Sequence, residues 1–336
     1  MATSFVDFER RPRRGSTSVL ALATLGCAAL VGCHAGERTS VRLESGAASS
    51  GVPQPSPNAS SSVSVDRLAN LTTAIGGDRD ALRHWAVCYT SRPSAADLAG
   101  YGVLVLDPDA HPPLAPLADR GQMLFAYLSL TEIARGRTFF PALQAGGLVL
   151  DRHPVWTESF YLDFRKPAWV RTIVEDLVPA LLQQGFHGLF LDTLDDAAFL
   201  EAKDGRRYGG MRASAIALVD TIRRHYPDVA IMVNRGYDLL PDMAGAVDIV
   251  LAESVRGTFD PAAKTFREVE GSEADAHVAR LHALREARPS LRIFTLDYWD
   301  PADTEGMRRL YAEQRHQGFV PYVSTPMLDR IVQEPK

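Results

Sequence analysis

Residues 185–196 read GFHGLFLDTLDD, an apolar run that passes directly into a group of acids. The segment 188–191 predicts a buried strand, and Asp192 follows it at once. A carboxylate at that position must face a cleft or be hydrogen-bonded, because an unpaired buried charge is unfavourable. Asp195 and Asp196 suit the start of the following helix, where aspartate is a favoured cap. Asp195 is also a candidate substrate contact, which leaves Asp192 as the catalytic candidate in this stretch.

Polar side chains stand at the ends of several other predicted strands. If those strands are parallel, their carboxyl ends meet at one face and the side chains line one cleft. Two aromatic residues near the same ends, Tyr127 and Tyr298, are candidates for stacking on sugar rings. The strand-end candidates outside 185–196 are Asp107, Glu132, Asp163, Asn234, Glu253 and Asp297.

Catalysis on a glycosidic bond needs two carboxyl groups that face each other across the bond, one protonated and one ionised. Neighbouring acids on one loop are badly placed for this, whereas residues from different strands, such as Asp192 and Glu253, are suitable. A metal site is the alternative for clustered acids, with carboxylates or histidines as ligands. The sequence has no H-E-x-x-H motif, and His187 precedes the strand that Asp192 follows. We therefore predict paired-carboxylate chemistry with no metal and no cofactor.

The elements that must position these residues alternate between short β-rich runs and longer amphipathic runs. Nearly continuous apolar strands predict a parallel sheet covered on both faces. The alternation predicts an α/β fold, a (β/α)8 TIM barrel in a single domain. The helix candidates are 169–184, 213–225, 275–287 and 304–316. The strand candidates are 84–89, 102–106, 123–130, 160–164, 188–191, 229–234, 248–252, 292–297 and 319–323. This is one strand too many for the barrel, and we take 319–323 to be the additional one.

The composition is that of a globular protein. Hydrophobic residues make up 46% of the 336, so most of the chain can bury a core. The net charge of −5 offers no basic face for nucleic acid. Cys88 lies in an apolar run, which predicts a buried core residue rather than a nucleophile. We expect a monomer.

The N-terminus has the pattern of a secretory signal. Four arginines precede the apolar run 19–31, which is too short to span a membrane. The segment LVGC (30–33) resembles the lipobox of bacterial lipoproteins, which implies that Cys33 is acylated and becomes the first residue. The following residues are rich in Ser, Ala, Gly and Pro and predict a flexible tether. We therefore divide the chain into a lipoprotein signal peptide (1–32), a tether (33–66) and a folded domain (67–336).

Six segments together resemble a known family: AYLSLTE (126–132), FYLDF (160–164), GFHGLFLDTLDD (185–196), IMVNRG (231–236), LAESV (251–255) and FTLDYWD (294–300). They are similar to the endo-α-1,4-polygalactosaminidase-like glycoside hydrolases of family 114. The resemblance covers about residues 84–325. It implies a (β/α)8 barrel, often secreted or attached to bacterial surfaces, that cleaves α-1,4-linked galactosaminoglycan chains.

Carried over position by position, the resemblance implies that Asp192 and Glu253 are the catalytic carboxylates. We assign Glu253 as general acid/base and Asp192 as nucleophile or stabiliser. The sequence departs from the family at Thr131, where glycine is common, and in the RG pair after Asn234. The remaining matches are Tyr127, Ser129 and Glu132 on the third strand, and Asp297 and Tyr298 on the eighth.

The sequence as a whole predicts an exported glycoside hydrolase, lipid-anchored in the cell envelope, that acts on an amino-sugar polysaccharide. Its expected partners are the polysaccharide and, through the lipid anchor, the membrane. One alternative is a carbohydrate-binding surface lipoprotein that kept the barrel but lost turnover, for which Thr131 is the support. The other is a metal-assisted TIM-barrel hydrolase. The separation of the Asp192 and Glu253 carboxyls would distinguish retaining from inverting chemistry.

Overall fold

A computed structural model describes residues 67–74, 76–77 and 79–336. The predicted signal peptide (1–32), the predicted tether (33–66) and Cys33 lie outside these residues. Within the described part of the chain, no helix is long and apolar enough to cross a membrane.

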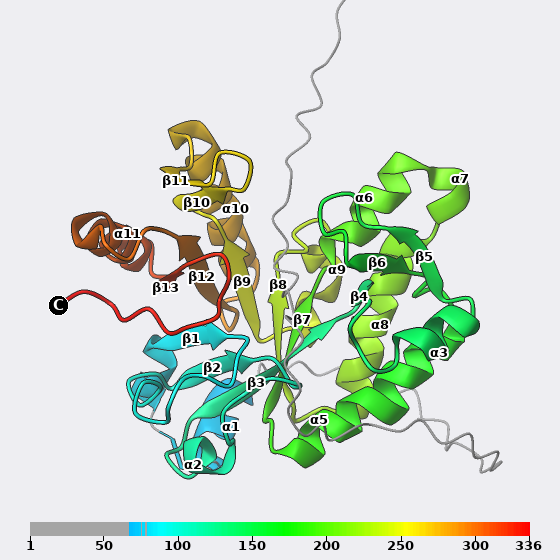
Figure 1. The fold of residues 1–336 in the computed structure, drawn as a ribbon, viewed down its shortest axis with the longest axis horizontal. Helices are drawn as coiled ribbons and strands as arrows, with labels where there is room; N and C mark the ends of the chain where they lie inside the picture. The colour runs from blue at the N-terminus through cyan, green and yellow to red at the C-terminus, as the bar shows by residue number, and fades with distance from the viewer. Residues whose placement is uncertain (1–66, 75, 78) are drawn as a thin grey trace, which may run out of the picture.

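Eight parallel strands form a nearly closed barrel (Figure 1), which confirms the predicted fold class. The two end strands of the sheet lie beside each other, and Trp85 Nε1 donates to the carbonyl oxygen of Val320 at 3.0 Å. Nearly every strand position is buried, as expected for parallel strands covered on both faces. The strands, in sheet order, are β1 (Trp85–Cys88), β2 (Val103–Leu106), β3 (Met123–Ser129), β7 (Gly188–Asp192), β8 (Ala230–Asn234), β9 (Ile249–Glu253), β12 (Arg292–Tyr298) and β13 (Val320–Ser324).

One strand prediction was wrong. The segment 319–323, taken as the additional strand, corresponds to β13, which pairs with β12 in the barrel. The segment 160–164 instead corresponds to β6 (Ser159–Leu162) in a separate antiparallel sheet. Both segments are short and apolar, so the choice between them depends on which partner strand each one meets.

Two insertions extend the connections at the carboxyl ends of the barrel strands. After β3 comes the small sheet, in the order β4-β6-β5, with β4 (Glu132–Ala134) and β5 (Val149–Arg152) flanking β6. After β9 comes a hairpin of β10 (Gly257–Asp260) and β11 (Thr265–Glu268). Figure 1 shows the small sheet beside α3 and α6, and the hairpin beside α10.

Helices connect the barrel strands, and the predicted ones at 169–184, 213–225, 275–287 and 304–316 are all present. The first lies within a continuous helical segment, 167–184, with a wider turn in its middle; it ends where Gly185 takes a φ of 106°. The helices are α1 (Arg67–Ala74), η1 (Arg79–Arg83), α2 (Ala115–Ala118), α3 (Phe140–Ala145), α4 (Pro167–Arg171), η2 (Thr172–Leu177), α5 (Val178–Gln184), α6 (Asp195–Lys203), α7 (Gly205–Tyr208), α8 (Met211–His225), α9 (Leu240–Met243), η3 (Ala244–Ala246), α10 (Gly271–Ala287) and α11 (Thr304–His316).

The barrel core extends from β1 across to β13. Trp85 packs against Phe294 and Tyr322, with ring centroids 5.5 and 5.6 Å apart. Cys88 is fully buried in this core, as predicted, and burial raises the pKa of its thiol. A buried thiol with a raised pKa is a poor nucleophile.

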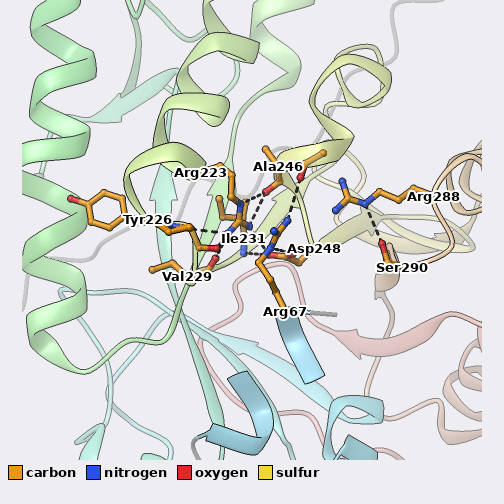
Figure 2. Close-up of polar contacts among 11 residues, drawn as sticks. Arg67, Arg223, Tyr226, Val229, Ile231, Ala246, Asp248, Arg288 and Ser290 are labelled. Atoms are coloured by element: carbon orange, nitrogen blue, oxygen red, sulfur yellow. Dashed lines mark hydrogen bonds and ion pairs between the residues drawn. The ribbon is translucent and has the colours of Figure 1, made fainter. Parts of the chain in front are cut away.

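Helix α1 docks at the amino ends of the barrel strands. Arg67 Nε donates to Asp248 Oδ1 at 3.0 Å, and Asp248 directly precedes β9 (Figure 2). The same carboxylate accepts from Arg223 Nη2 at 2.6 Å and from the backbone N–H of Ile231 at 2.9 Å. The first described residue, Arg67, is thus fixed to the face opposite the strand-end acids.

Candidate active site

Three polar side chains meet where three adjacent barrel strands end. Asp192 ends β7, Asn234 ends β8 and Glu253 ends β9, and all three are buried. The amide Nδ2 of Asn234 donates to Asp192 Oδ1 at 2.9 Å and to Glu253 Oε2 at 3.1 Å. One amide therefore joins the two carboxyls that sequence analysis selected as catalytic.

Two tyrosine hydroxyls contact the same carboxyls. Tyr298 donates to Glu253 Oε1, and the Tyr127 hydroxyl is hydrogen-bonded to Asp192. The Tyr127 ring packs against Tyr89, with centroids 5.1 Å apart, and the Tyr298 ring is fully buried. The structure thus places both hydroxyls on the carboxyl pair and both rings in buried positions.

The Asp192 carboxyl has a pKa raised to about 7. Burial is the largest cause, and the negative charge of Glu253 is the second. Hydrogen bonds from Asn234 and Tyr127 favour the ionised form but do not offset the burial. Two buried carboxyls this close cannot both ionise easily, so the pair tends to share one proton near neutral pH.

Two of the predicted substrate contacts are paired with arginines. Asp107, directly after β2, accepts two hydrogen bonds from Arg137, at 3.0 and 2.7 Å, in a buried bidentate pair. Asp163, next to β6 in the small sheet rather than in the barrel, accepts from Arg165 at 2.7 and 3.1 Å. The Asp107 pair joins the barrel rim to the insertion that carries Arg137.

Two other predicted contacts accept hydrogen bonds from backbone N–H groups. Asp195 Oδ1 accepts from Gly236 at 2.6 Å, and its Oδ2 lies 3.3 Å from Arg235 Nε. Asp297 Oδ1 accepts from the N–H groups of Arg256 and Gly257, at 2.8 and 2.9 Å. Both carboxylates therefore contact the turns that follow β8 and β9.

The predicted helix caps are not formed. Helix α6 begins at Asp195, but its cap position is Leu194 and no side chain accepts there. Asp196 instead contacts Thr131 Oγ1, 2.9 Å from its Oδ2, and lies close to Glu132. Both carboxyls thus bind residues far away in the sequence instead of the N–H groups of the helix end.

Glu132, His153 and Asp196 form a second cluster, with potential ligand atoms within 4.8 Å of one another. Ser159 donates to Glu132 Oε2, and burial together with the Glu132 charge raises the pKa of Asp196 well above its usual value. Burial lowers the pKa of His153. The cluster therefore combines two carboxyls, of which Asp196 has a raised pKa, with an imidazole whose pKa is lowered.

The hydrogen bonds of His153 bear on a metal site. Its Nδ1 accepts from the backbone N–H groups of Val155 and Trp156, at 3.2 and 2.9 Å. A neutral imidazole that accepts at Nδ1 carries its proton on Nε2, which is the nitrogen 3.7 Å from Glu132. A protonated nitrogen cannot ligate a metal, so this cluster does not fit an ion bound through His153.

The arrangement has close counterparts among known proteins. The sequence model of glycoside hydrolase family GH114 matches residues 70–336. The chain belongs to this family. The glycoside hydrolase domain of PelA from Pseudomonas aeruginosa is 31% identical; the match covers 75% of this chain and 98% of that domain, with a TM-score of 0.66.

A more distant counterpart shares the fold of this GH114 chain. Ega3 from Aspergillus fumigatus, solved in complex with galactosamine, is 14% identical, with a TM-score of 0.56. The match covers 75% of this chain and 94% of that one. Among curated proteins, the search finds no match to this sequence.

Several residues that shape the GH114 site were missed by sequence analysis. Arg137 lies in the insertion, and His153 and Ser159 lie in or beside its strands; nothing in their spacing points to the barrel rim. Thr131, noted only as a departure from the family pattern, contacts Thr193 and Asp196. The departure in the RG pair was a usable signal, because Arg235 is the ion-pair partner of Asp195.

Proposed function

We propose that this GH114 hydrolase cleaves an amino-sugar polysaccharide of the α-1,4-galactosaminoglycan kind, with Asp192 and Glu253 as its catalytic carboxylates. One observation carries the proposal: Asn234 Nδ2 bridges these two carboxyls at the ends of β7 and β9. Glycosidases need two carboxyls in that relation, one on each side of the scissile bond.

The carboxyl separation supports a retaining reaction. Asp192 Oδ1 and Glu253 Oε2 lie 2.9 and 3.1 Å from the same nitrogen of Asn234. These two oxygens are therefore at most about 6 Å apart, whereas inverting enzymes hold their carboxyls about 6.5 to 9.5 Å apart to admit a water. Retaining enzymes hold them about 5 to 5.5 Å apart.

The pKa of Asp192 favours a role assignment opposite to the one made from the sequence. A general acid must hold a proton near neutral pH, and the charge of the partner carboxylate usually raises its pKa. Asp192 has this property, with a pKa raised to about 7 by burial and by Glu253. We therefore assign Asp192 as general acid/base and Glu253 as nucleophile.

In the first step the Glu253 carboxylate attacks the anomeric carbon, the glycosidic C–O bond breaks, and Asp192 gives its proton to the departing oxygen. In the second step Asp192 takes a proton from water, the water oxygen attacks the anomeric carbon, and the bond to Glu253 breaks. The Tyr298 hydroxyl holds one oxygen of Glu253 so that the other can face the sugar. Asp192 thus loses its proton in the first step and regains one in the second, so the pair returns to its starting protonation state.

An amino sugar suits the charge of this site. A deacetylated sugar carries an ammonium group, which is attracted to negative charge. The carboxyl ends of the barrel strands, here called the mouth, are lined by carboxylates. A second pair of carboxyl groups adds to the acidic character of the site. Glu132 is the first residue of β4, which follows β3, and Asp196 lies in α6. The galactosamine complex of Ega3, which shares the fold, supports the same substrate class.

We also propose that the enzyme is exported and lipid-anchored through Cys33 in the cell envelope, and acts there as a monomer. An enzyme that acts on an exported polysaccharide must itself be exported, and the first described helix, α1, docks at the face opposite the strand-end acids. Arg67, the first described residue, therefore lies at the face opposite the strand-end acids. If Cys33→Ala is no longer labelled by fatty acid and no longer found in the membrane fraction, the anchor is supported. If the variant keeps both properties, the anchor is rejected.

The activity test uses partly deacetylated α-1,4-galactosaminoglycan and reducing-end release. Asp192→Asn and Glu253→Gln should each abolish release, whereas Asp228→Asn, a change of an exposed aspartate at the opposite face, should not. Nuclear magnetic resonance of the first product gives its anomeric configuration. Release at the wild-type rate by both variants would reject the proposal, and inversion would reject the retaining mechanism.

Neither alternative gains support from the site geometry. Thr131 was the one argument for a barrel without turnover, yet its hydroxyl is hydrogen-bonded beside the catalytic strand end. The metal-assisted alternative needs a ligand set, and His153 is in the wrong tautomer to supply one. Binding without reducing-end release would restore the first alternative, and loss of activity in a chelator would restore the second.

A further inference from the structure

The residues that directly follow the clustered side chains share an unusual backbone conformation. The φ angle is 69° at Thr193, 54° at Arg235 and 55° at Ser254. Only two other non-glycine residues in the described part of the chain have a positive φ. The residues they follow are, in order, Asp192, Asn234 and Glu253.

A left-handed backbone is strained for these residue types. The Cβ atom crowds the neighbouring carbonyl oxygen, and a β-branched residue such as Thr193 tolerates this least. Strain of this kind persists only where the surroundings hold it in place, and it concentrates at functional sites. If a turn relaxed, the backbone would rotate and the carboxyl or amide just before it would move.

Hydroxyl groups hold the turn after β7. Thr131 donates to the carbonyl oxygen of Thr193, and the backbone N–H of Thr131 donates to Thr193 Oγ1 at 3.1 Å. Ser129 Oγ lies 2.9 Å from the same Oγ1. Asp196 Oδ2 lies 2.9 Å from Thr131 Oγ1, so the clamp is itself fixed to α6.

The carboxylate of Asp195 holds the turn after β8. Its Oδ1 accepts from the N–H of Gly236 at 2.6 Å, and its Oδ2 pairs with the Arg235 side chain at 3.3 Å. One carboxylate thus contacts both the backbone N–H of Gly236 and the charged side chain of Arg235.

The carboxylate of Asp297 holds the turn after β9. Its Oδ1 accepts from the N–H groups of Arg256 and Gly257, at 2.8 and 2.9 Å. Its Oδ2 accepts from Gln314 Nε2 at 2.6 Å, and Asp297 is fully buried. Because both oxygens are engaged and enclosed, this carboxylate has no surface to offer a substrate.

We infer that Thr131, Asp195 and Asp297 are positioning residues, which clamp the three strained turns and thereby aim Asp192, Asn234 and Glu253 at the scissile bond. This inference rests on the proposed function for its catalytic consequence. It replaces the interpretation of Asp195 and Asp297 as substrate contacts. A substrate contact needs the negative charge, whereas a clamp needs only an acceptor oxygen, and this difference makes the two roles separable.

The main experiment compares Asp297→Ala with Asp297→Asn. The asparagine Oδ1 can still accept from Arg256 and Gly257, and Gln314 Oε1, which has no hydrogen-bond partner, can turn to accept from the new amide. We expect Asp297→Ala to lower kcat about tenfold to a hundredfold with KM within twofold of wild type, because misplacing a catalytic group affects the reacting state. Asp297→Asn should restore most of kcat.

Hydrogen–deuterium exchange gives a readout that does not depend on any substrate. The Arg256 and Gly257 amides should exchange faster in Asp297→Ala than in wild type, and at the wild-type rate in Asp297→Asn. If the wild-type protein does not cleave the galactosaminoglycan, the proposed function fails, and the exchange data still decide whether the clamp exists.

Two further pairs keep the test open if Asp297→Ala does not fold. Thr131→Val removes the hydroxyl and Thr131→Ser retains it, while Asp195→Ala and Asp195→Asn repeat the acceptor comparison at a partly exposed site. In each pair the variant that keeps the hydrogen bond should keep kcat. Equal losses within the pairs for Asp195 and Asp297, with a raised KM, would overturn the inference in favour of charge-based substrate binding. Unchanged kcat in Thr131→Val and both alanine variants would also overturn it.

Discussion

Strand β9 has a buried carboxylate at each end, Asp248 before it and Glu253 at its last position, and the surroundings of the two ends differ. At the amino ends of β8 and β9, Asp248 accepts from two arginines and a backbone N–H (Figure 2). At the carboxyl ends, Asp192 and Glu253 are held together by the amide of Asn234. At the amino ends the carboxylate of Asp248 is surrounded by positive charge. At the carboxyl ends the carboxyls of Asp192 and Glu253 lie close to each other.

The difference separates stability from chemistry. A carboxylate that accepts hydrogen bonds from two guanidinium groups has partners for its charge, which suits a structural role. A carboxylate beside another carboxylate is destabilised as an ion, and the raised pKa of Asp192 is the result. The carboxyl pair at the carboxyl ends of the strands therefore has a proton to transfer, whereas the ion pairs at the amino ends stabilise the fold.

The largest effect should come from the mouth and leave the fold intact. Asp192→Asn or Glu253→Gln should lower kcat by about 10³-fold or more, because each removes half of the carboxyl pair. Neither should lower the free energy of unfolding at pH 7. Reducing-end release and urea unfolding measure the two quantities, and a variant that lost activity only by unfolding would contradict the comparison.

A change at the opposite face should lower the free energy of unfolding and leave kcat unchanged. Asp248→Ala leaves Arg67 and Arg223 without their shared carboxylate, and removing one member of a buried ion pair costs about 3 to 5 kcal/mol. Urea unfolding measures this loss, with Asp228→Ala as the exposed control at the same face. The kcat of the folded fraction should match that of wild type, and a specific loss of kcat would show that the two ends are coupled.

Removing the charge at Asp192 should stabilise the protein at alkaline pH. The pKa of this carboxyl rises from 3.8 in the unfolded chain to about 7 in the folded one, so the folded state must give up a proton unfavourably as pH rises through this range. Asp192→Asn should therefore raise the free energy of unfolding at pH 8 by as much as about 4 kcal/mol, and hardly change it at pH 4. Equal effects at both pH values would contradict the raised pKa.

The pH profile of the reaction should report the same proton. If Asp192 is the general acid, kcat/KM falls about tenfold per unit as pH rises above its pKa, near 7. If kcat/KM instead rises with pH through 7, Asp192 acts as the ionised nucleophile, and the roles assigned from the sequence are restored. Glu253→Gln provides the baseline without a nucleophile.

The smallest effect on the free energy of unfolding should come from Arg67, at the edge of the face opposite the mouth. Arg67 is partly exposed, and without it Asp248 keeps Arg223 and the Ile231 N–H. Arg67→Ala should lower the free energy of unfolding by about 1 kcal/mol, since solvent screens part of this ion pair. A loss as large as that of Asp248→Ala would mean that α1, rather than Arg223, secures this end of the barrel.

Much of the fold could be predicted because local patterns repeat along the chain. Continuous apolar runs such as 188–191 and amphipathic runs such as 304–316 are each decided by their own residues. The barrel role of β13 could not be predicted, because β6 has the same local character and only pairing with β12 distinguishes them. Placement of Asp192 and Glu253 at one end of the barrel followed from their positions after parallel strands.

The roles of the other strand-end acids depended on residues far away in the sequence. Asp107 faces Arg137, which lies in an insertion of unpredictable path, and Asp297 faces two N–H groups of the turn after β9. No spacing rule reveals such partners, because loop conformation is set by packing rather than by a period. For the same reason, the positive φ of Thr193 cannot be read from a threonine in the sequence.

The sequence by itself determined that this chain alternates strands and helices, and that acids follow the strands at one end. That information is local, since apolar period and strand length are properties of consecutive residues. Only the tertiary structure decided which acid carries a shared proton, which is neutralised by arginine and which holds a strained turn. Charge, burial and hydrogen-bond geometry depend on neighbours in space, so identical aspartates acquire different chemistry from the positions at which the barrel places them.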